Sequence, residues 1–520
     1  MTGSAAMSMD GYRSIADIPF RQARLDPRRT ALAHSGGALS FADLDERSRR
    51  FASFLERSGV GPGDRVAVLL PNLPEFAVAY FGAMAAGAVA VPVNTRLAPP
   101  EVGYVLRDCA AAALVTTAPR LEALAGEAFP VLRLRVTVRG QAPGAIPFPA
   151  SLAAPPRPQP AEVEPGAVAT LLYTSGTTGF PKGAMITHQN ALFNAASCRA
   201  TLGYRREDVG LVSLPLFHVT ALHSQLVALL ALGGSVVLQE EYDTRQALAL
   251  VSAHGATALF FVPAIYKLFT LRDDLPRYDL TRVRVAAYGG APMDPETVRA
   301  VQRLLPAELH NCYGLTECSS LATVLPAELA LSRADSVGRA VPGTEAEVRD
   351  EAGQRLPPGE AGELWLRGPH VVKGYWGAPE KTAQAIRDGW LRTGDVARID
   401  RDGLVVILDR VKDMINRGGE KIYGLEVENV LYAFPGVAEA AVVGVPHPVF
   451  GEVPAAFVAA LPGASLDPEA IRRHCASRLA DFKVPVAVRF VEKLPRNPGG
   501  KVLKQSLKRA WEAGPEEKSR

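Results

Sequence analysis

Cysteine and excess charge are both scarce in this sequence, and each shortage excludes a class of protein. The net charge is only +3, so no basic surface for nucleic acid or an anionic membrane is expected. The few cysteines are scattered, and no two of them form a Cys-x-x-Cys pair. This spacing argues against a zinc site or a disulfide framework and predicts reduced thiols in a cytoplasmic protein. The five cysteines are Cys109, Cys198, Cys312, Cys318 and Cys475.

Secretion and membrane segments are also missing from the pattern. Residues 1–9 lack the basic stretch followed by an apolar stretch that a secretion signal requires. The longest apolar run, Ala77 to Val93, is rich in alanine and glycine and is interrupted by Pro92. Because such a run is too small in its side chains for a lipid-facing helix, we expect a buried helix leading into a strand and no integral membrane segment.

The length of 520 residues exceeds what one hydrophobic core usually organises, so we expect at least two domains. Ser40 and Asp43 predict the capped start of a helix that continues through Leu55, and 65–70 reads as a short buried strand. This alternation is typical of an α/β domain with a mostly parallel sheet. The proline-dense segment 140–165 is expected to be a surface loop.

The second domain is expected to begin after the strand 404–408, which divides the chain into 1–410 and 411–520. The C-terminal part carries a pattern of its own, and this pattern predicts a small α+β domain. Its expected elements are strands at 440–445, 455–460 and 486–491 and a helix at 468–479.

A glycine- and threonine-rich loop follows the apolar strand 167–173. Its glycines free successive backbone N–H groups to turn toward one anion, its hydroxyls add short donors, and Lys182 adds a compact charge. The loop residues are Thr174, Ser175, Gly176, Thr177, Thr178 and Gly179. A flexible linker is the alternative, but linkers seldom follow a buried strand. No Gly-Lys-Ser/Thr stands at Walker spacing, so a P-loop is excluded.

This loop resembles the signature of the adenylate-forming enzymes, which include acyl-CoA synthetases, luciferases and peptide-synthetase adenylation domains. Matching segments extend from about Leu39 to Leu503. The resemblance implies a large N-terminal α/β domain with mostly parallel sheets and a small mobile α+β C-terminal domain. It also implies that a carboxylic acid reacts with ATP to give acyl-AMP and pyrophosphate, and that CoA then takes the acyl group.

The resemblance assigns nucleotide-binding roles to three further segments. In Asn311 to Glu317, Tyr313 and Gly314 are expected beside the adenine, Thr316 as a donor to the α-phosphate and Glu317 as a ligand of Mg²⁺. Asp395 and Arg410 resemble the ribose contacts, since one carboxylate can accept from both hydroxyls. The segment expected to border the adenine is Gly290, Ala291 and Pro292. Asn311-Cys312 replaces the small residues often found before the tyrosine, which leaves the acyl preference open.

His218 resembles the aromatic gate between the carboxylate and the CoA channel. Amino-acid activators place an Asp nearby to pair the substrate ammonium, and none stands here. Because an unpaired ammonium in a closed site costs several kcal/mol, an α-amino acid is not expected. The absence of charge in 219–222 favours an apolar tail. The residues expected to line the acyl pocket with His218 are Thr220, Ser224, Phe261 and Val262.

The C-terminal segments are expected to move. Lys412 resembles the hinge, and Gly418 and Gly419 resemble the segment beside the pantetheine tunnel. Lys501 resembles the terminal lysine that neutralises charge between the carboxylate and the α-phosphate, so Lys501, Lys182, Thr316 and His218 are the predicted catalytic residues. After Tyr423 the family commonly has proline, whereas this chain has Gly424, which predicts a looser turn.

Several alternatives stay open. An adenylating enzyme that loads a carrier protein, or oxidises the acyl group as luciferases do, fits the same motifs, although no carrier domain follows Lys501. A nucleotide-binding module without turnover is the more distant alternative, against which Lys501 and Glu317 stand. The sequence does not identify the acid or the pathway, and it does not decide between a monomer and a homodimer.

Overall fold

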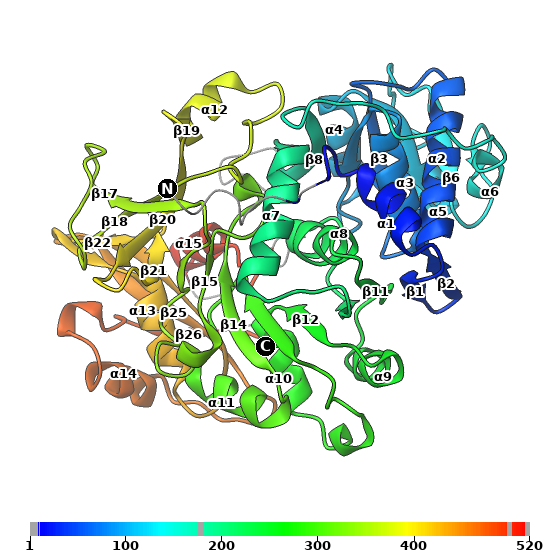
Figure 1. Ribbon diagram of the computed structural model, residues 1–520. Coiled ribbons are helices and arrows are strands. Elements are labelled where there is room, and N and C mark those ends of the chain that lie inside the picture. The colour runs from blue at the N-terminus through cyan, green and yellow to red at the C-terminus, as the bar shows by residue number, and fades with distance from the viewer. Residues whose placement is uncertain (1–8, 10, 175–180, 497–501, 515–520) are drawn as a thin grey trace, which may run out of the picture. The chain divides into compact units, whose positions relative to one another are not determined.

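The computed structural model describes the chain except for residues 1–8, 10, 175–180, 497–501 and 515–520 (Figure 1). Its contacts divide the chain into two compact units. The first comprises Met1–Ala346 and Leu366–Arg392, and the second comprises Glu347–Trp365 and Thr393–Arg520. The predicted domains 1–410 and 411–520 follow a different criterion and stay a prediction.

A seven-stranded sheet of the first unit carries the glycine- and threonine-rich segment. All of its neighbouring strands are parallel except the last pair, β8 and β9, which form an antiparallel hairpin. The strands in spatial order are β7 (Ile146–Pro147), β6 (Leu134–Thr137), β5 (Ala111–Thr116), β3 (Arg65–Leu69), β4 (Val89–Pro92), β8 (Val168–Thr174) and β9 (Lys182–Thr187).

A nine-stranded sheet is the other sheet of the first unit. Its middle strands are parallel, and antiparallel strands close both of its edges. The strands in spatial order are β16 (Arg339–Ala340), β15 (Thr323–Val324), β14 (Glu308–Tyr313), β13 (Val285–Gly289), β12 (Ala258–Phe261), β10 (Val209–Val212), β11 (Ser235–Leu238), β1 (Thr30–His34) and β2 (Gly37–Ser40).

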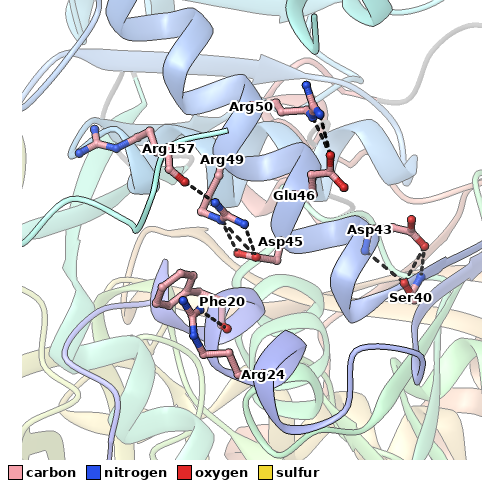
Figure 2. Close-up of polar contacts among 9 residues, drawn as sticks. All are labelled: Phe20, Arg24, Ser40, Asp43, Asp45, Glu46, Arg49, Arg50 and Arg157. Carbon is pink, nitrogen blue, oxygen red and sulfur yellow. Dashed lines mark hydrogen bonds and ion pairs between the residues drawn. The ribbon is translucent and has the colours of Figure 1, made fainter. Parts of the chain in front are cut away.

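Helix α2 (Phe41–Arg57) begins where the sequence predicts. The Ser40 side chain accepts from the backbone N–H of Asp43, while the Asp43 carboxylate accepts from that of Ser40 (Figure 2). Further along, Arg49 pairs with Asp45 one turn earlier and also donates to the backbone oxygen of Arg157 (Figure 2). The Arg49–Asp45 pair is largely buried, and it links the helix to the segment around Arg157.

Helix α3 (Pro74–Ala85) is buried on every face, as predicted for the alanine-rich run, and leads into β4. The first unit contains further helical elements. They are α1 (Asp17–Leu25), α4 (Pro99–Asp108), α5 (Ala118–Glu122), α6 (Phe148–Ser151), α7 (His188–Thr201), the π-helix η2 (Thr220–Val227), α8 (Ala228–Ala231), α9 (Thr244–His254), α10 (Pro263–Thr270), η3 (Leu275–Arg277), α11 (Pro295–Leu304), η4 (Thr316–Cys318), η5 (Ala327–Leu329) and α12 (Pro379–Ala385).

The proline-rich segment 140–165 differs from the prediction of a loop throughout. It contains the short strand β7 and the helix α6, because Phe148 is buried and the hydroxyl of Ser151 donates to the backbone oxygen of Phe148. All five cysteines are reduced and buried, as the spacing predicts. In the part of the chain that the structure describes, none of the helices combines the length and hydrophobicity needed to span a bilayer.

A third sheet is formed by five strands from the region between Glu345 and Arg410. They are β17 (Glu345–Arg349), β18 (Ala361–Arg367), β20 (Trp390–Ile399), β19 (Ile386–Arg387) and β21 (Val405–Arg410). Strand β21 pairs with β20 in antiparallel register, and the pairing places Asp395 opposite Arg410.

The C-terminal part of the second unit has the predicted α+β pattern. A fourth sheet packs around buried side chains such as Ile415, Ile422, Leu431 and Ile471. The elements are β22 (Ile415–Arg417), β23 (Glu420–Ile422), α13 (Gly424–Tyr432), β24 (Val437–His447), β25 (Gly451–Ala460), α14 (Pro468–Ala476), η6 (Asp481–Lys483), β26 (Val488–Phe490) and α15 (Lys504–Glu512).

Candidate active site

The β8–β9 hairpin presents the glycine- and threonine-rich loop at the edge of the seven-stranded sheet. Thr174, the last residue of β8, is paired across the hairpin with Lys182, the first residue of β9. The two ends of the loop are therefore fixed side by side. The predicted phosphate-binding residues between them, Ser175, Gly176, Thr177, Thr178 and Gly179, lie outside the described residues.

Lys182 and Glu317 meet at the ring of Tyr375. The ammonium nitrogen of Lys182 lies 5.0 Å from the centroid of this ring, and the Tyr375 hydroxyl donates to Oε1 of Glu317 at 2.8 Å. Burial and the neighbouring Glu317 carboxylate raise the pKa of Tyr375, so its hydroxyl stays protonated and remains a donor. One aromatic side chain thus joins the predicted cation to the predicted metal ligand.

Sequence reasoning missed Tyr375. The backbone of 373–376 runs beside β9, where Met185 donates to the Gly374 oxygen at 2.8 Å and Trp376 donates to the Gly183 oxygen at 2.8 Å. Nothing in the local pattern around Tyr375 signals this pairing, because its partners lie far away in the sequence.

Two parallel strands bring the predicted adenine segments together. Gly289, at the end of β13, is in register with Cys312 near the end of β14. A Cβ on Gly289 would lie 2.5 Å from the Cys312 oxygen, so only glycine permits this approach. Gly290, Ala291 and Pro292 therefore follow one strand, and Tyr313 and Gly314 the next, at the carboxyl edge where α/β proteins bind ligands.

Thr316 and Glu317 lie on the short helix η4, directly after Gly314. The backbone oxygen of Glu317 accepts from the N–H of Val372 at 3.0 Å. A Cβ on Gly314 would lie 1.5 Å from the backbone oxygen of Ser320, so the chain folds back tightly on itself after this helix. Both Thr316 and Glu317 are half-buried.

A buried polar network supports the turn that follows η4. Ser319 and Ser320 both have positive φ angles, of 54° and 110°, which residues other than glycine rarely adopt. His223 lies between the Ser319 hydroxyl, at 3.1 Å, and the Tyr80 hydroxyl, at 3.2 Å. Burial lowers the pKa of His223 to about 3, so the ring is neutral and can bond both hydroxyls.

Ser224, which is predicted to line the acyl pocket, belongs to this network. Its side chain is fully buried, and its hydroxyl donates to the Ser320 hydroxyl at 2.7 Å. The Asn194 amide on α7 donates to Ser224 at 3.2 Å and accepts from the backbone N–H of Leu321 at 3.1 Å. Ser224 therefore holds the turn behind η4.

Phe261, also predicted to line the acyl pocket, packs against other aromatic rings. Its ring is fully buried and packs against Tyr266, with ring centroids 5.5 Å apart, and against Phe269, at 5.8 Å. These contacts place it in the hydrophobic core between β12 and α10. Thr220 and Val262, in contrast, are half-buried and remain candidates for the pocket wall.

His218 lies just before the π-helix η2. Its half-buried ring packs against Phe217, with ring centroids 4.6 Å apart. Burial, together with the charge of Arg96, lowers the pKa of His218 to about 4. At neutral pH the ring is therefore uncharged, as a gate beside an acyl group requires.

Asp395 and Arg410, the predicted ribose contacts, are brought together by the β20–β21 pairing. Nε of Arg410 lies 3.0 Å from Oδ1 of Asp395, and the Asp395 side chain is only 5% exposed. The guanidinium fixes one carboxylate oxygen.

The predicted C-terminal site residues lie on two turns. Gly418 and Gly419 occupy the exposed turn between β22 and β23 with φ angles of 59° and 99°, a conformation that favours glycine. Lys412 is exposed at the surface, and partial desolvation of its ammonium lowers its pKa. Lys501 lies outside the described residues.

The turn at Gly424 is not the looser one that the sequence predicts. Gly424 is the first residue of α13, and its N–H donates to the carboxylate of Asp409 in a buried hydrogen bond. Gly424 therefore makes a contact through its backbone N–H, a group that proline lacks.

Comparisons with known proteins agree with this arrangement. The model of the AMP-binding enzyme family matches residues 19–376, and that of the AMP-binding enzyme C-terminal domain matches residues 426–501. A feruloyl-CoA synthase of Amycolatopsis is 39% identical over 500 residues, covering 96% of this chain and 99% of that protein. The fatty acid–[acyl-carrier-protein] ligase ScoC of Streptomyces coeruleorubidus is 36% identical over 501 residues, covering 94% and 95%.

A solved structure shows the same fold with an intermediate bound. The o-succinylbenzoate CoA synthetase MenE of Bacillus subtilis, in complex with the acyl-adenylate OSB-AMP, has a TM-score of 0.84 and 30% identity, and covers 95% of this chain and 98% of that one. The resemblance to adenylate-forming enzymes is thereby confirmed. The chain belongs to the AMP-binding enzymes of the adenylate-forming superfamily and is an acyl-CoA synthetase-like, ATP-dependent ligase that works through an acyl-adenylate.

Proposed function

We propose that this AMP-forming acid–CoA ligase activates a carboxylic acid with an uncharged tail and uses Lys182, Thr316 and Lys501 to stabilise the charge that builds up at the α-phosphate. The observation that carries the proposal is the contact of Lys182 and Glu317 with the two ends of one Tyr375 side chain. A cation and a carboxylate held this close suit a triphosphate that carries its own counter-ion.

The reaction has two steps. A carboxylate oxygen of the acid attacks the α-phosphorus of ATP, the bond to the β-phosphate oxygen breaks, and pyrophosphate leaves. The thiol of CoA then loses its proton and attacks the acyl carbon, and AMP leaves. Lys182 would stabilise the phosphate charge in the first step, and Thr316 would donate to the α-phosphate. Lys501 would neutralise the charge between the carboxylate and the α-phosphate.

Glu317 is the residue that fits Mg²⁺. Mg²⁺ often takes one carboxylate and fills its remaining positions with phosphate oxygens and water. Among the residues that the structure describes, no group of three or more acidic, histidine or cysteine side chains forms a dedicated metal site. Glu317, half-buried and held by Tyr375, is a single carboxylate of this kind. Bound with the triphosphate, the Mg²⁺ ion would neutralise negative charge on the pyrophosphate as it leaves.

The acid is proposed to be aromatic or fatty. The segment 219–222 carries no charge, and His218 is neutral at pH 7 because burial lowers its pKa to about 4. Feruloyl-CoA synthase, at 39% identity, bears an aromatic acid in its name. Arg96 is exposed and its charge reaches His218, so a dicarboxylate belongs in the test as the competing class.

The test is a panel of ferulic, cinnamic, medium-chain fatty and dicarboxylic acids, scored for pyrophosphate and AMP release with and without CoA. Release with an aryl or fatty acid and little with a dicarboxylate supports the proposal, and the reverse order overturns the acid class. Lys182→Met is expected to lower pyrophosphate release about 100-fold. Lys381→Met, at an exposed position of α12, is the matched control and should leave it unchanged.

A second acceptor is favoured by one observation. ScoC, 36% identical to this chain, is named a ligase of fatty acids to acyl-carrier protein. Thioester formation from preformed acyl-AMP should therefore be compared with CoA and with phosphopantetheinylated carrier protein as acceptor. Faster transfer to CoA supports the proposed function, and transfer to the carrier alone replaces it.

A further inference from the structure

A buried charge cluster joins the end of strand β21 to the C-terminal helices. The ammonium of Lys504, at the start of α15, lies 2.8 Å from the Glu428 carboxylate on α13, and their side chains are only 17% and 11% exposed. Oε1 of Glu428 also accepts from the backbone N–H of Val442 at 2.8 Å. Asp409, the next-to-last residue of β21, is 6% exposed and completes the cluster.

The place of Asp409 in this cluster depends on Gly424. Its N–H donates to Oδ2 of Asp409, and proline could not make this bond because it has no N–H. A Cβ at Gly424 would lie 3.0 Å from the Lys504 nitrogen and 3.2 Å from the Asp409 oxygen. The Lys504 ammonium and the Asp409 carboxylate therefore both lie close to the Cα of Gly424, where a side chain would crowd them.

The Lys504 ammonium keeps its charge inside the cluster, and this charge reaches the segment that follows β21. Burial alone would lower the pKa of Lys504, but Glu428 and Asp409 outweigh it and raise the pKa, so the ammonium is retained. The charge of Lys504 also acts on Lys412 and Asp413. Oδ1 of Asp409 accepts from the backbone N–H of Arg410 at 2.7 Å, which ties the cluster to a proposed ribose contact.

The position of the cluster gives it a consequence for motion. Asp409 precedes Lys412 in the chain, whereas Gly424, Glu428 and Lys504 follow it. Rotation of the backbone at Lys412 moves everything after this residue relative to everything before it. The hydrogen bond of Asp409 to Gly424 and its electrostatic attraction to Lys504 therefore exist in one arrangement of the hinge and are lost in the other.

We propose that Lys504 is a positioning residue which, with Asp409, Glu428 and the N–H of Gly424, fixes the hinge segment in one of its two arrangements. This inference rests on the hinge at Lys412 that belongs to the proposed function. Loss of the cluster frees the hinge segment, slows the half-reaction performed in the latched arrangement and leaves the other half-reaction intact.

The test uses two variants and a matched control in the full-length protein. Lys504→Met removes the buried cation. Gly424→Pro removes the N–H donor and crowds the Lys504 ammonium. Helix α13 still forms in this variant, because proline is well tolerated at the first position of a helix and the extended backbone of Tyr423 suits a following proline. Lys508→Met is the control, because Lys508 lies one turn further along α15 and pairs with Glu452 at 3.4 Å.

The first readout is trypsin cleavage after Arg410 and Lys412 under native conditions. Both test variants are expected to accelerate it about tenfold, while cleavage elsewhere and the Lys508→Met variant match the wild type. Cleavage that is unchanged in a folded variant, or accelerated equally at every site, overturns the proposal. This readout needs no substrate, so it stands even if no acid in the panel is activated.

The second readout is the ratio of the two half-reactions, acid-dependent pyrophosphate release and thioester formation from preformed acyl-AMP. The ratio is expected to change about tenfold in both test variants and not in Lys508→Met. If both half-reactions fall by the same factor, the cluster has a structural role alone and the proposal fails. Should Lys504→Met fail to fold because two carboxylates are left buried, Gly424→Pro, which keeps the ion pair with Glu428, decides the question.

Discussion

At the scale of the residue, Tyr375 carries more of the proposed site than its position in the sequence indicates. Its hydroxyl fixes one oxygen of Glu317, and its ring faces the Lys182 ammonium. Because the hydroxyl is held in its protonated form, it donates at every pH at which the enzyme would work. Without this donor the Glu317 carboxylate is free to rotate. The Lys182 ammonium then faces a ring that no longer binds Glu317.

Tyr375→Phe is therefore expected to keep the ring and lose the positioning of Glu317. Pyrophosphate release should fall about tenfold, and the Mg²⁺ concentration needed for half-maximal rate should rise, because Glu317 is the proposed Mg²⁺ ligand. The measurement is a Mg²⁺ titration of acid-dependent pyrophosphate release. Tyr432→Phe serves as the control, since its hydroxyl donates only to the backbone oxygen of Ala440. An unchanged Mg²⁺ requirement would contradict the role given to Tyr375.

At the scale of the element, the π-helix η2 and helix α7 support η4 from behind. His223 and Ser224, both on η2, contact Ser319 and Ser320 in turn, and Asn194 on α7 joins them. The strained backbone at Ser319 and Ser320 is kept in place by these bonds. The short helix with Thr316 and Glu317 therefore depends on hydrogen bonds from two elements far away in the sequence.

Ser224→Ala tests this support. It leaves the Ser320 and Asn194 groups short of a buried partner, which is expected to lower the free energy of unfolding by about 1–3 kcal/mol. Ser197→Ala is the control, because the Ser197 hydroxyl is buried but donates only to the Phe193 oxygen of its own helix, at 2.9 Å. Denaturant unfolding provides the stability, and the acid panel provides a second measure. A selective change of acid preference, with stability intact, would restore Ser224 to the pocket wall.

At the scale of the whole molecule, several buried histidines tie stability to pH. Burial lowers the pKa of His188 to about 4, of His223 to about 3 and of His370 to about 4. The unfolded chain takes up these protons near pH 6.5, whereas the folded chain resists them until much lower pH. The contribution of these histidines to the free energy of unfolding is therefore fully present above about pH 6.5 and is lost as the pH falls toward 4.

Each of these histidines is expected to remove about 1.4 kcal/mol of unfolding free energy per pH unit within that window. Urea unfolding at pH 7.5, 6.5 and 5.5 measures the slope. In His188→Asn the slope should decrease by about that amount, since an amide oxygen can replace Nδ1 as the acceptor for the N–H of Ile15 without binding a proton. An identical slope in the variant and the wild type would refute this origin of acid sensitivity.

The sequence predicted the features that depend on near neighbours. Ser40 and Asp43 signal the start of α2 because a capping box is local, and the apolar run before Thr174 signals β8 for the same reason. Side-chain direction was harder to predict. Phe260 and Phe261 are both apolar on a strand buried on both faces, and they pack into different core clusters, Phe261 into the one with Tyr266.

Long-range contacts and special backbone conformations explain the remaining differences. Ser224 is predicted to line the acyl pocket, and the sequence pattern gives no sign of its hydrogen bonds with Ser320 and Asn194. Tyr375 and Glu317 are 58 residues apart, and no periodicity connects them. Gly424 was interpreted as a missing proline because its partner, Asp409, approaches only in the folded chain.

The pairing of Thr174 with Lys182 has a practical consequence for protein engineering. Since both ends of the proposed nucleotide loop are anchored by the same strand pair, residues between them are expected to be exchangeable for those of another adenylating enzyme without altering the sheet. The hairpin is thus a suitable recipient for loop libraries that aim to change nucleotide preference, with the remainder of the scaffold kept constant.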